Sequence, residues 1–428
     1  MVSASLGALP PKAPPCGPLG IARGPHADGL EHHCWDENLR IVDLRRYRGA
    51  SLDGGDKEGV TVSDGSTRRH QRQWIAAAVA AGLMGWLAVP AGQAAPAPIK
   101  VKAGIVAAID QLGVPVAQDR GFFEKSGLDV TIANPYPTGV DLLNALQAGE
   151  VQIGQVGVPM IGAVLRGMDL VIVGNYSGSS VRLGGDNTMA LVARQGSQIK
   201  TVTDLRGKRI AVSFGTISHL YILGVLERAR LAVNDVTLVN IPPAEMPVAL
   251  RGGAVDAFAT WDPFPVIALQ DVPNAYEVVR GGNFIGFMGF VVALRSWVER
   301  NQETVERFLA ARAESDKYMR NNDVKTAEIA VRWLPGLQRT PAVALRGVRN
   351  NRPNLDIRIS YYNYLALHMA VATLNRLGFT SGTFDVNKVF VPGPIYGVMQ
   401  KYPDSFSDLP PIPKAAQAGA GFVFTPPK

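Results

Sequence analysis

Cysteine and histidine are scarce in this sequence of 428 residues. The two cysteines, Cys16 and Cys34, both precede the one strongly hydrophobic segment, and none follows it. The part from Ala95 onward therefore has no cysteine for a disulfide, a thiolate nucleophile or a cysteine metal site. Its only histidines are His219 and His368, which excludes a metal site built from several histidines.

Long runs of charge are also missing. Charged residues make up 18% of the chain, and its net charge of +7 is scattered without long basic runs. This favours a basic exported protein over a nucleic-acid-binding protein. A hydrophobic content of 47% is typical of a globular protein, and a chain of this length predicts two lobes or domains.

The hydrophobic segment at residues 74–89 has the pattern of an export signal. It follows Arg68, Arg69 and Arg72, and Gly92 and Ala94 stand at the spacing of a cleavage site. Its apolar core is shorter than the roughly 20 residues that a membrane-spanning helix needs. We therefore expect residues 68–94 to be a signal peptide that sends the protein to the periplasm.

Two features of the chain start leave alternatives open. Arg68 and Arg69 allow a twin-arginine route, although Gln71 replaces the hydrophobic residue that this signal prefers. We expect residues 1–67 to be unstructured or to reflect a misassigned start, with Val60 or Val62 as other initiators. A metal site is the weaker interpretation of one cluster there, because no folded context surrounds it. That cluster consists of His26, His32, His33 and Cys34.

From residue 99 onward, strand-like and helix-like segments alternate. One series ends near residue 177 and a second begins near residue 208. Residues 299–374 are almost entirely helical in pattern, and the last stretch is rich in proline and glycine. This alternation predicts an α/β protein with parallel sheets covered by helices.

A glycine turn precedes a helical pattern in KRIAVSFGTISHLYILGVLERA, residues 208–229. Unpaired N–H groups at a helix start, together with the positive end of the helix dipole, suit an anion. The alternative is that Ser or Thr only caps its own helix. The turn consists of Gly215, Thr216, Ile217, Ser218 and His219.

Other loops at the carboxyl ends of predicted strands supply amides, hydroxyls, aromatic rings and glycines. Ligands gather at these ends in open parallel sheets. No Ser-His-Asp order, paired carboxylates or phosphate-binding glycine loop is present. A pocket of donors and aromatic walls without a base and nucleophile favours binding over turnover. We therefore expect a protein that is not an enzyme and needs no cofactor or metal.

Several motifs together resemble the nitrate/sulfonate/taurine-type periplasmic substrate-binding proteins of ABC importers. They are the glycine turn, "PPAE" followed by "ALRGGAVDA", and "WDPF", with "DRGFFEKSGLDVTI" upstream. The resemblance covers roughly residues 99–322. It implies a type II periplasmic-binding-protein fold, in which two α/β lobes joined by a two-strand hinge close on a solute.

The resemblance also implies domain boundaries. Lobe 1 begins with residues 95–193, lobe 2 follows as residues 194–286, and residues 287–400 return to lobe 1 with a helical C-terminal section. Residues 401–428 are expected to form an extended tail.

By the same resemblance, the turn of residues 215–219 binds an anionic head group. Gln111, Gly157, Val158, Trp261 and Asp262 complete the walls, and Tyr176 is a further candidate. Arg182 would be a charge partner if its loop faced the cleft.

Each of these side chains also has a structural alternative. Gln111 and Asp262 would cap helices, Trp261 would pack in the core, and His219 is either a neutral donor or a packed core group.

The sequence thus predicts a monomeric periplasmic receptor that binds a small organic anion and delivers it to an ABC permease in the inner membrane. An alkyl or aryl sulfonate is the favoured solute; nitrate, bicarbonate and an uncharged pyrimidine precursor remain alternatives. The enzyme alternative is a thiamine-pyrimidine synthase-like protein, against which the absence of cysteine from residue 95 onward argues.

Overall fold

The computed structural model describes residues 97–334, 341–419 and 421–427. The predicted signal peptide at residues 68–94, the preceding residues 1–67 and the His26, His32, His33, Cys34 cluster lie outside them. Within the described part, none of the helices combines the length and apolar character that crossing a membrane requires.

Five strands form the first sheet, in the order β2-β1-β3-β10-β4. β1 is parallel to β2 and β3, whereas β10 runs antiparallel to both β3 and β4. All residues of β3 and β4 are buried, as expected for strands covered on both faces. The strands span Ile99–Gly104 (β1), Leu128–Ile132 (β2), Ile153–Val156 (β3), Leu170–Ser177 (β4) and Gly289–Leu294 (β10).

Five further strands form the second sheet, in the order β7-β6-β8-β5-β9. They span Met189–Ala193 (β5), Arg209–Val212 (β6), Thr237–Asn240 (β7), Ala257–Trp261 (β8) and Tyr276–Arg280 (β9). β5 pairs antiparallel with β8 and β9, so the assignment of residues 189–193 to lobe 1 is wrong. An apolar strand looks the same in sequence whichever sheet it joins. The other lobe boundaries stay predictions.

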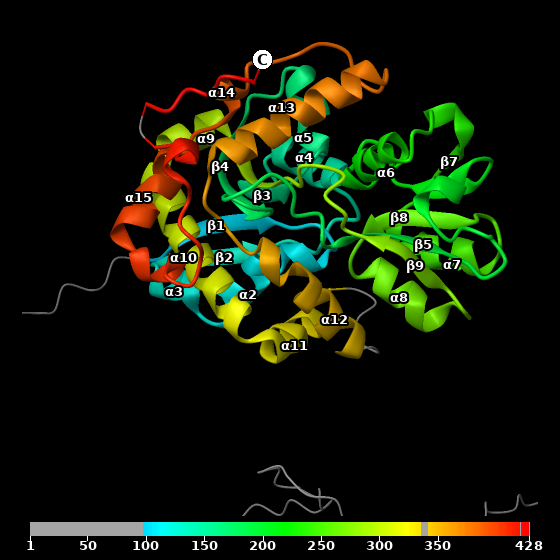
Figure 1. The fold of residues 1–428 in the computed structure, drawn as a ribbon. Coiled ribbons are helices and arrows are strands. Elements are labelled where there is room, and N and C mark those ends of the chain that lie inside the picture. Colours follow the sequence, from blue (N-terminus) through cyan, green and yellow to red (C-terminus); the bar gives the residue numbers. More distant parts are fainter. Residues whose placement is uncertain (1–96, 335–340, 420, 428) are drawn as a thin grey trace, which may run out of the picture. The chain divides into compact units, whose positions relative to one another are not determined.

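The chain crosses between the two sheets twice, through residues 178–188 and 281–288. The buried carboxylate of Asp186, in the first crossing, accepts hydrogen bonds from the N–H groups of Asn283 (3.0 Å) and Phe284 (2.9 Å) in the second. One acid thus ties the two crossings together. In Figure 1 the strands β1 to β4 lie on one side of these crossings, and β5, β7, β8 and β9 lie on the other.

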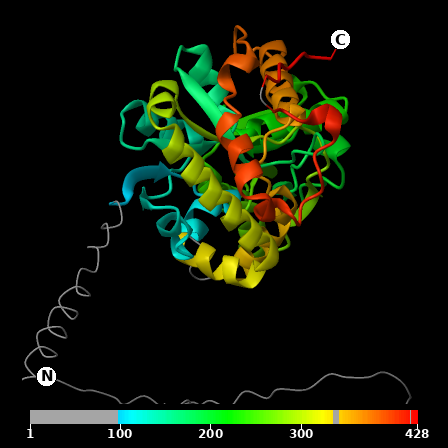
Figure 2. The ribbon, with the colours of Figure 1, turned by 90° about the vertical axis from the view of Figure 1, so that its left-hand side faces the viewer.

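Helices cover both sheets and then form a C-terminal section, whose yellow-to-red helices face the viewer in Figure 2. The helices between the strands are η1 (Ile109–Gln111), α2 (Gly113–Asp119), α3 (Phe122–Lys125), α4 (Gly139–Gln147), α5 (Pro159–Leu165), η2 (Val202–Leu205), α6 (Ile217–Arg228), η3 (Val233–Asp235), η4 (Pro243–Glu245), α7 (Met246–Arg251) and α8 (Phe264–Asp271). The C-terminal section contains α9 (Arg295–Arg300), α10 (Gln302–Asn321), α11 (Asp323–Trp333), α12 (Pro341–Asn351), η5 (Arg352–Asn354), α13 (Tyr361–Arg376), α14 (Val386–Val389), α15 (Gly393–Lys401), η6 (Pro403–Phe406) and η7 (Lys414–Ala416).

The C-terminal section packs mainly on the first lobe. α10 packs against α2, α3 and α15, and α12 contacts both η1 of the first lobe and α8 of the second. Residues after 401 were expected to be an extended tail, but Phe424 is buried against Tyr361 and Tyr364 of α13. Apolar residues spaced between the prolines account for this packing.

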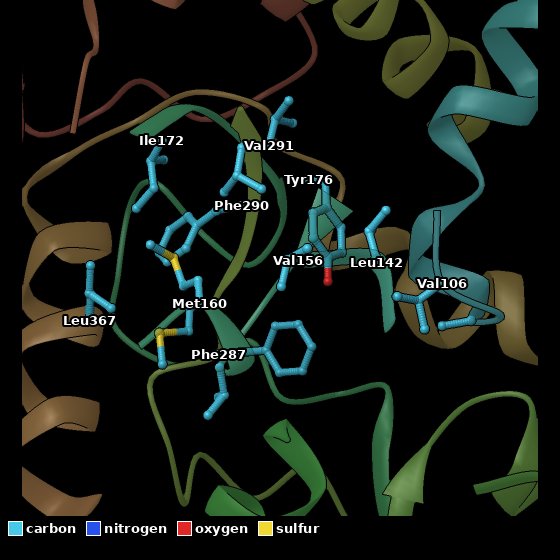
Figure 3. Close-up of a cluster of buried hydrophobic side chains, with 14 of the residues drawn as sticks. Val106, Leu142, Val156, Met160, Ile172, Tyr176, Phe287, Phe290, Val291 and Leu367 are labelled. Atoms are coloured by element: carbon cyan, nitrogen blue, oxygen red, sulfur yellow. The ribbon is translucent and has the colours of Figure 1, made fainter. Parts of the chain in front are cut away.

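The largest core cluster surrounds the first sheet. Figure 3 shows part of it, with Ile172, Phe290 and Val291 from the strands and Leu367 from α13. This rigid core positions the loops at the sheet edge, where Tyr176 and Phe287 lie near one another in the same view.

Candidate functional site

A pocket lies where the carboxyl ends of strands from both sheets meet. β1, β3 and β4 contribute from the first lobe, and β6 and β8 contribute from the second. Because β10 runs antiparallel, the residues before it reach the same edge. The lining residues are Val106, Ala108, Asp110, Gln111, Gly139, Gly157, Val158, Pro159, Tyr176, Thr216, Ile217, Trp261, Phe287 and Met288.

The structure brings together most of the predicted site residues. Those that line the pocket are Gln111, Gly157, Val158, Tyr176, Thr216, Ile217 and Trp261, whereas Gly215, Ser218, His219 and Asp262 do not line it. Sequence reasoning missed Val106, Ala108, Asp110, Gly139, Pro159, Phe287 and Met288. Asp110 carried a usable signal, because it precedes Gln111 at the end of the first strand. Phe287 and Met288 line the pocket because they directly precede β10, and the position of this strand in the first sheet could not be predicted from the sequence.

The hydroxyl groups at the start of α6 are engaged within the protein. Thr216 donates its hydroxyl proton to the Ser213 carbonyl (2.7 Å) and accepts from the Ser218 N–H (3.2 Å). Ser218 donates its proton to the Ala259 carbonyl on β8 and accepts from the Ser213 N–H. A hydroxyl has one proton to donate, so neither side chain has one left for an anion. These bonds fix the turn between β6 and α6 instead.

Several backbone N–H groups at the pocket are free to bind a ligand, in contrast to the hydroxyl groups at the start of α6. The N–H groups of Gly139, Gly157, Val158 and Ile217 have no hydrogen-bond partner among the residues that the structure describes. Gly139 and Ile217 begin α4 and α6, which present the positive ends of their dipoles. All four residues line the pocket, so both lobes offer donors to it.

Trp261, the last residue of β8, supplies an unsatisfied donor. Its side chain is 5% exposed, and its indole Nε1 is buried without a hydrogen-bond partner. Indole N–H can only donate, and a buried unpaired donor destabilises a protein. An acceptor atom of a ligand in the pocket would satisfy this group.

Gln111 and Tyr176 add two further polar groups. The Gln111 Oε1 accepts from Gln155 Nε2 (3.0 Å) and from the Val106 N–H (3.3 Å), and the Gln111 side chain also hydrogen-bonds Tyr176. Burial raises the pKa of Tyr176 well above its ordinary value, so its hydroxyl stays protonated. Figure 3 shows this hydroxyl pointing toward the side on which Phe287 lies.

Asp110, on η1, is the one carboxyl group among the lining residues. It is 5% exposed and makes no ion pair with a described Lys or Arg. Burial raises the pKa of Asp110 to about 7, against the opposing effect of hydrogen bonds from its own backbone and Ser177. The charge of nearby Asp262 raises this pKa further.

Asp262 is held outside the pocket. Its fully buried carboxylate pairs with Arg280 (2.8 and 3.2 Å) and accepts a hydrogen bond from Asn350 of α12 (2.8 Å). Burial raises its pKa to about 6, although Arg280 and Asn350 lower it. The capping interpretation is wrong, because the N-cap of α8 is Pro263 and no side chain caps this helix.

His219 is a packed group behind the turn. It stacks on Phe214 (ring centroids 4.8 Å apart) and meets the edge of Phe379 (4.2 Å). Burial lowers its pKa to about 4, so it is neutral at pH 7. Its Nδ1 accepts from the Gly215 N–H (3.4 Å), and its Nε2 is buried without a partner.

The pocket therefore combines neutral donors and aromatic walls without a cationic side chain. No Lys, Arg or His is among its lining residues, and Arg182 hydrogen-bonds Asn283 instead of reaching it. The described residues also contain no group of three or more His, Cys, Asp or Glu side chains placed to hold a metal ion. This arrangement can hold a small polar solute by hydrogen bonds and aromatic contact.

Comparison with known proteins identifies the family. The family described as "NMT1/THI5 like" matches residues 108–325, about half of the chain. A protein of Escherichia coli (strain K12) named for binding aliphatic sulfonates is 29% identical over 272 residues, which are 62% of this chain and 82% of that protein. The taurine-binding periplasmic protein of the same organism is 29% identical over 216 residues, 49% of this chain and 64% of that protein.

Solved structures agree on the fold. The alkanesulfonate-binding protein of Xanthomonas axonopodis pv. citri bound to MOPS superimposes with a TM-score of 0.61 at 24% identity, covering 69% of this chain and 99% of that chain. This likeness confirms the predicted periplasmic-binding-protein fold with two α/β lobes. Because the family match spans both lobes and all the strands that carry the pocket loops except β1, the chain belongs to the NMT1/THI5-like family.

Proposed function

We propose that this protein is an extracytoplasmic solute-binding protein of an ABC importer, and that its solute is a small organic anion with a sulfonate group. The observation behind the proposal is the pocket lined from both lobes, with free backbone N–H groups and the unpaired indole N–H of Trp261. Aliphatic sulfonates and taurine, for which two relatives are named, carry such a head group.

Neutral donors suit this head group. A sulfonate has three acceptor oxygens and a charge spread over them, so several N–H groups can bind it at once. The helix starts at Gly139 and Ile217 add favourable dipoles from opposite lobes. The aromatic rings of Tyr176, Trp261 and Phe287 supply apolar walls for the carbon chain.

Binding couples to lobe closure in this proposal. The donors Ile217 and Trp261 belong to the second lobe, whereas the other donors belong to the first. A solute that contacts both sets stabilises only the conformation that brings them together. The closed form is then the one that an inner-membrane permease recognises, and the protein works as a monomer.

A thermal-shift and calorimetric screen of the purified protein tests the proposal. The panel contains alkyl and aryl sulfonates, nitrate, bicarbonate and pyrimidines. A solute at 100 times its Kd should raise the free energy of unfolding by about 2.7 kcal/mol. We expect this stabilisation from a sulfonate and not from nitrate, which needs no apolar wall.

Stabilisation by a pyrimidine and by no sulfonate would overturn the sulfonate assignment in favour of a pyrimidine receptor. Binding of nothing in the panel would overturn both.

A further inference from the structure

We infer that α12 stabilises the closed conformation by bonding to the second lobe, and that Arg346 and Asn350 are the positioning residues through which it acts. The closed conformation is the one in which both lobes line the pocket. This inference rests on the proposed function, because it concerns the lobe closure that accompanies binding there. It adds a contact that keeps part of the empty protein closed without touching the solute.

The first argument is that α12 is attached to the first lobe. Arg349 of α12 forms an ion pair with Asp323 of α11 (2.7 Å), and α11 packs against α2. α12 also packs directly against η1. In Figure 1, α12 lies between α11 and α8 of the second lobe. We therefore expect α12 to move with the first lobe when the lobes separate.

The second argument is that side chains of α12 bond to the second lobe. Asn350 donates a hydrogen bond to the carboxylate of Asp262 (2.8 Å), which is fully buried. Arg346 pairs with Glu277 of β9 (3.0 Å) and lies four residues before Asn350, on the same face of the helix. Arg280 pairs with both acids, so it holds them in place for these contacts.

The third argument is that the same contact region adjoins the pocket. The Ile109 N–H of η1 donates to the Asp262 carbonyl (3.1 Å), which joins the two lobes directly. A Cβ built at Gly347 of α12 would lie 2.9 Å from Ile109 Cγ1 and 3.6 Å from Asp262 Cβ, so the helix packs closely against both.

The chain neighbours of this contact give its direction. Asp110 follows Ile109, and Trp261 precedes Asp262; both neighbours line the pocket, from opposite lobes. A movement that separates these pocket walls also separates Ile109 from Asp262. The bonds from α12 to the second lobe therefore stabilise the closed conformation and not the open one. Neither Arg346 nor Asn350 lines the pocket.

Charge reversal on α12 tests the inference. Arg346→Glu places a like charge beside Glu277 of the second lobe and should favour separated lobes. Arg349→Glu is the matched control, because Arg349 lies on the same helix with a similarly exposed side chain (59% against 48%), and its partner belongs to α11. In the empty protein, the ratio of open to closed molecules should rise at least fivefold in Arg346→Glu. It should stay within twofold of wild type in Arg349→Glu.

Pulsed electron paramagnetic resonance measures this ratio from the distance between spin labels on the two lobes. Cysteines replace Val248 of α7 and Glu124 of α3, which are both exposed. Serines replace Cys16 and Cys34, so that the labels attach only at the two new positions. Melting temperatures confirm that each variant is folded.

A swap of side chains tests Asn350. Asn350→Asp places a second carboxylate against Asp262 across the lobes and should raise the open fraction. Affinity for propane-1-sulfonate should fall by the factor by which the closed fraction falls. Adding Asp262→Asn restores an amide facing a carboxylate, and the double variant should recover the closed fraction to within threefold of wild type. A structural role of Asn350 within its own helix predicts no such recovery.

Equal open-to-closed ratios in Arg346→Glu and Arg349→Glu would overturn the inference and leave the proposed function intact. An empty wild-type protein without a closed population would overturn it as well. The distances are measured without solute, so they decide the inference separately from the solute. Failure of every sulfonate to bind would overturn the proposed function alone.

Discussion

At the scale of single residues, the pocket holds two groups that destabilise the empty protein. Asp110 is a buried carboxyl group without a cation, and Trp261 has a buried N–H group without an acceptor. The Trp261 donor would be satisfied by an acceptor oxygen of a bound solute. Binding sites often contain groups of this kind, which lower the stability of the protein when no ligand is bound.

Replacing Asp110 by Asn should stabilise the empty protein at high pH. The folded-state pKa of Asp110 is about 7, above its ordinary value of 3.8, so the folded state binds this proton more tightly than the unfolded state. The penalty therefore grows as pH rises from about 4 and is complete above about 7. A pKa difference of about three corresponds to about 4 kcal/mol, which is an upper limit for the gain.

Chemical denaturation of the empty Asp110→Asn variant at pH 5 and pH 8 measures this effect. The gain over wild type should be about two to three times as large at pH 8 as at pH 5, and the control Asp129→Asn, at an exposed position of the edge strand β2, should show no such growth. Asp262 interacts with Asp110, so any change in its titration on removal of the Asp110 charge is part of the measured gain, whereas Tyr176 stays protonated at both pH values. A gain that is the same at both pH values would contradict the raised pKa.

Trp261→Phe should separate ligand binding from stability. Phenylalanine keeps an aromatic ring against the pocket but removes the unpaired Nε1–H. A hydrogen bond to a charged group contributes about 1.5–3 kcal/mol, so affinity for the sulfonate should fall about ten- to hundredfold. The melting temperature of the empty protein should stay equal or rise. The control variant Trp297→Phe, on α9 outside the pocket, should change neither affinity nor melting temperature much. Unchanged affinity in Trp261→Phe would show that the indole N–H does not bind the solute.

At the scale of elements, the turn between β6 and α6 is a rigid platform for backbone donors. Gly215 has φ +73°, a conformation that residues with a Cβ rarely adopt. A Cβ built at Gly215 meets nothing within 4 Å, so a substitution there acts through backbone strain and not through a clash. The Thr216 and Ser218 hydroxyls hold the remainder of the turn.

Gly215→Ala should weaken solute binding and stability together. Left-handed backbone costs a residue with a Cβ about 1–2 kcal/mol, and relief of this strain would move the Ile217 N–H away from the pocket. Gly207→Ala is the matched control, since Gly207 also has φ +73° and an open Cβ position but lies outside the pocket. Both variants should lose similar stability by thermal denaturation, and only Gly215→Ala should lose affinity. Equal affinities in the two variants would show that the turn does not contact the solute.

The sequence predicted the α/β lobes and most pocket loops, because these depend on local signals. Alternating apolar segments mark the strands, and Gly215 and Thr216 mark the start of α6 in a short window. Partners distant in sequence could not be predicted. Asp262 was predicted to line the pocket, with capping of α8 as the alternative, but its carboxylate is held by Arg280 and by Asn350, which lies 88 residues along the chain. Likewise, the sequence cannot show that Asp110 has no ion pair with a described Lys or Arg, because this depends on where those side chains lie in the fold.

At the scale of the whole molecule, the proposed receptor role predicts that a bound solute is not chemically changed. Its lining includes Asp110, Tyr176 and Thr216 as groups that could exchange protons, and the Thr216 hydroxyl donates to Ser213. We expect a bound sulfonate to be recovered chemically unchanged after prolonged incubation with the protein. Chromatography with mass detection measures it, with a heat-denatured sample as the control. A product that increases in proportion to the protein concentration would contradict a pure binding role and point to Asp110 as a base.

The position of β10 has a consequence for the order in which the chain acquires its structure. β10 lies between β3 and β4, so β4 has no strand to pair with until residue 294 has been synthesised. All strands of the second sheet lie within residues 189–280, an uninterrupted stretch. During synthesis the inserted lobe can therefore complete its sheet while the lobe encoded first still lacks the strand that joins β4 to its sheet.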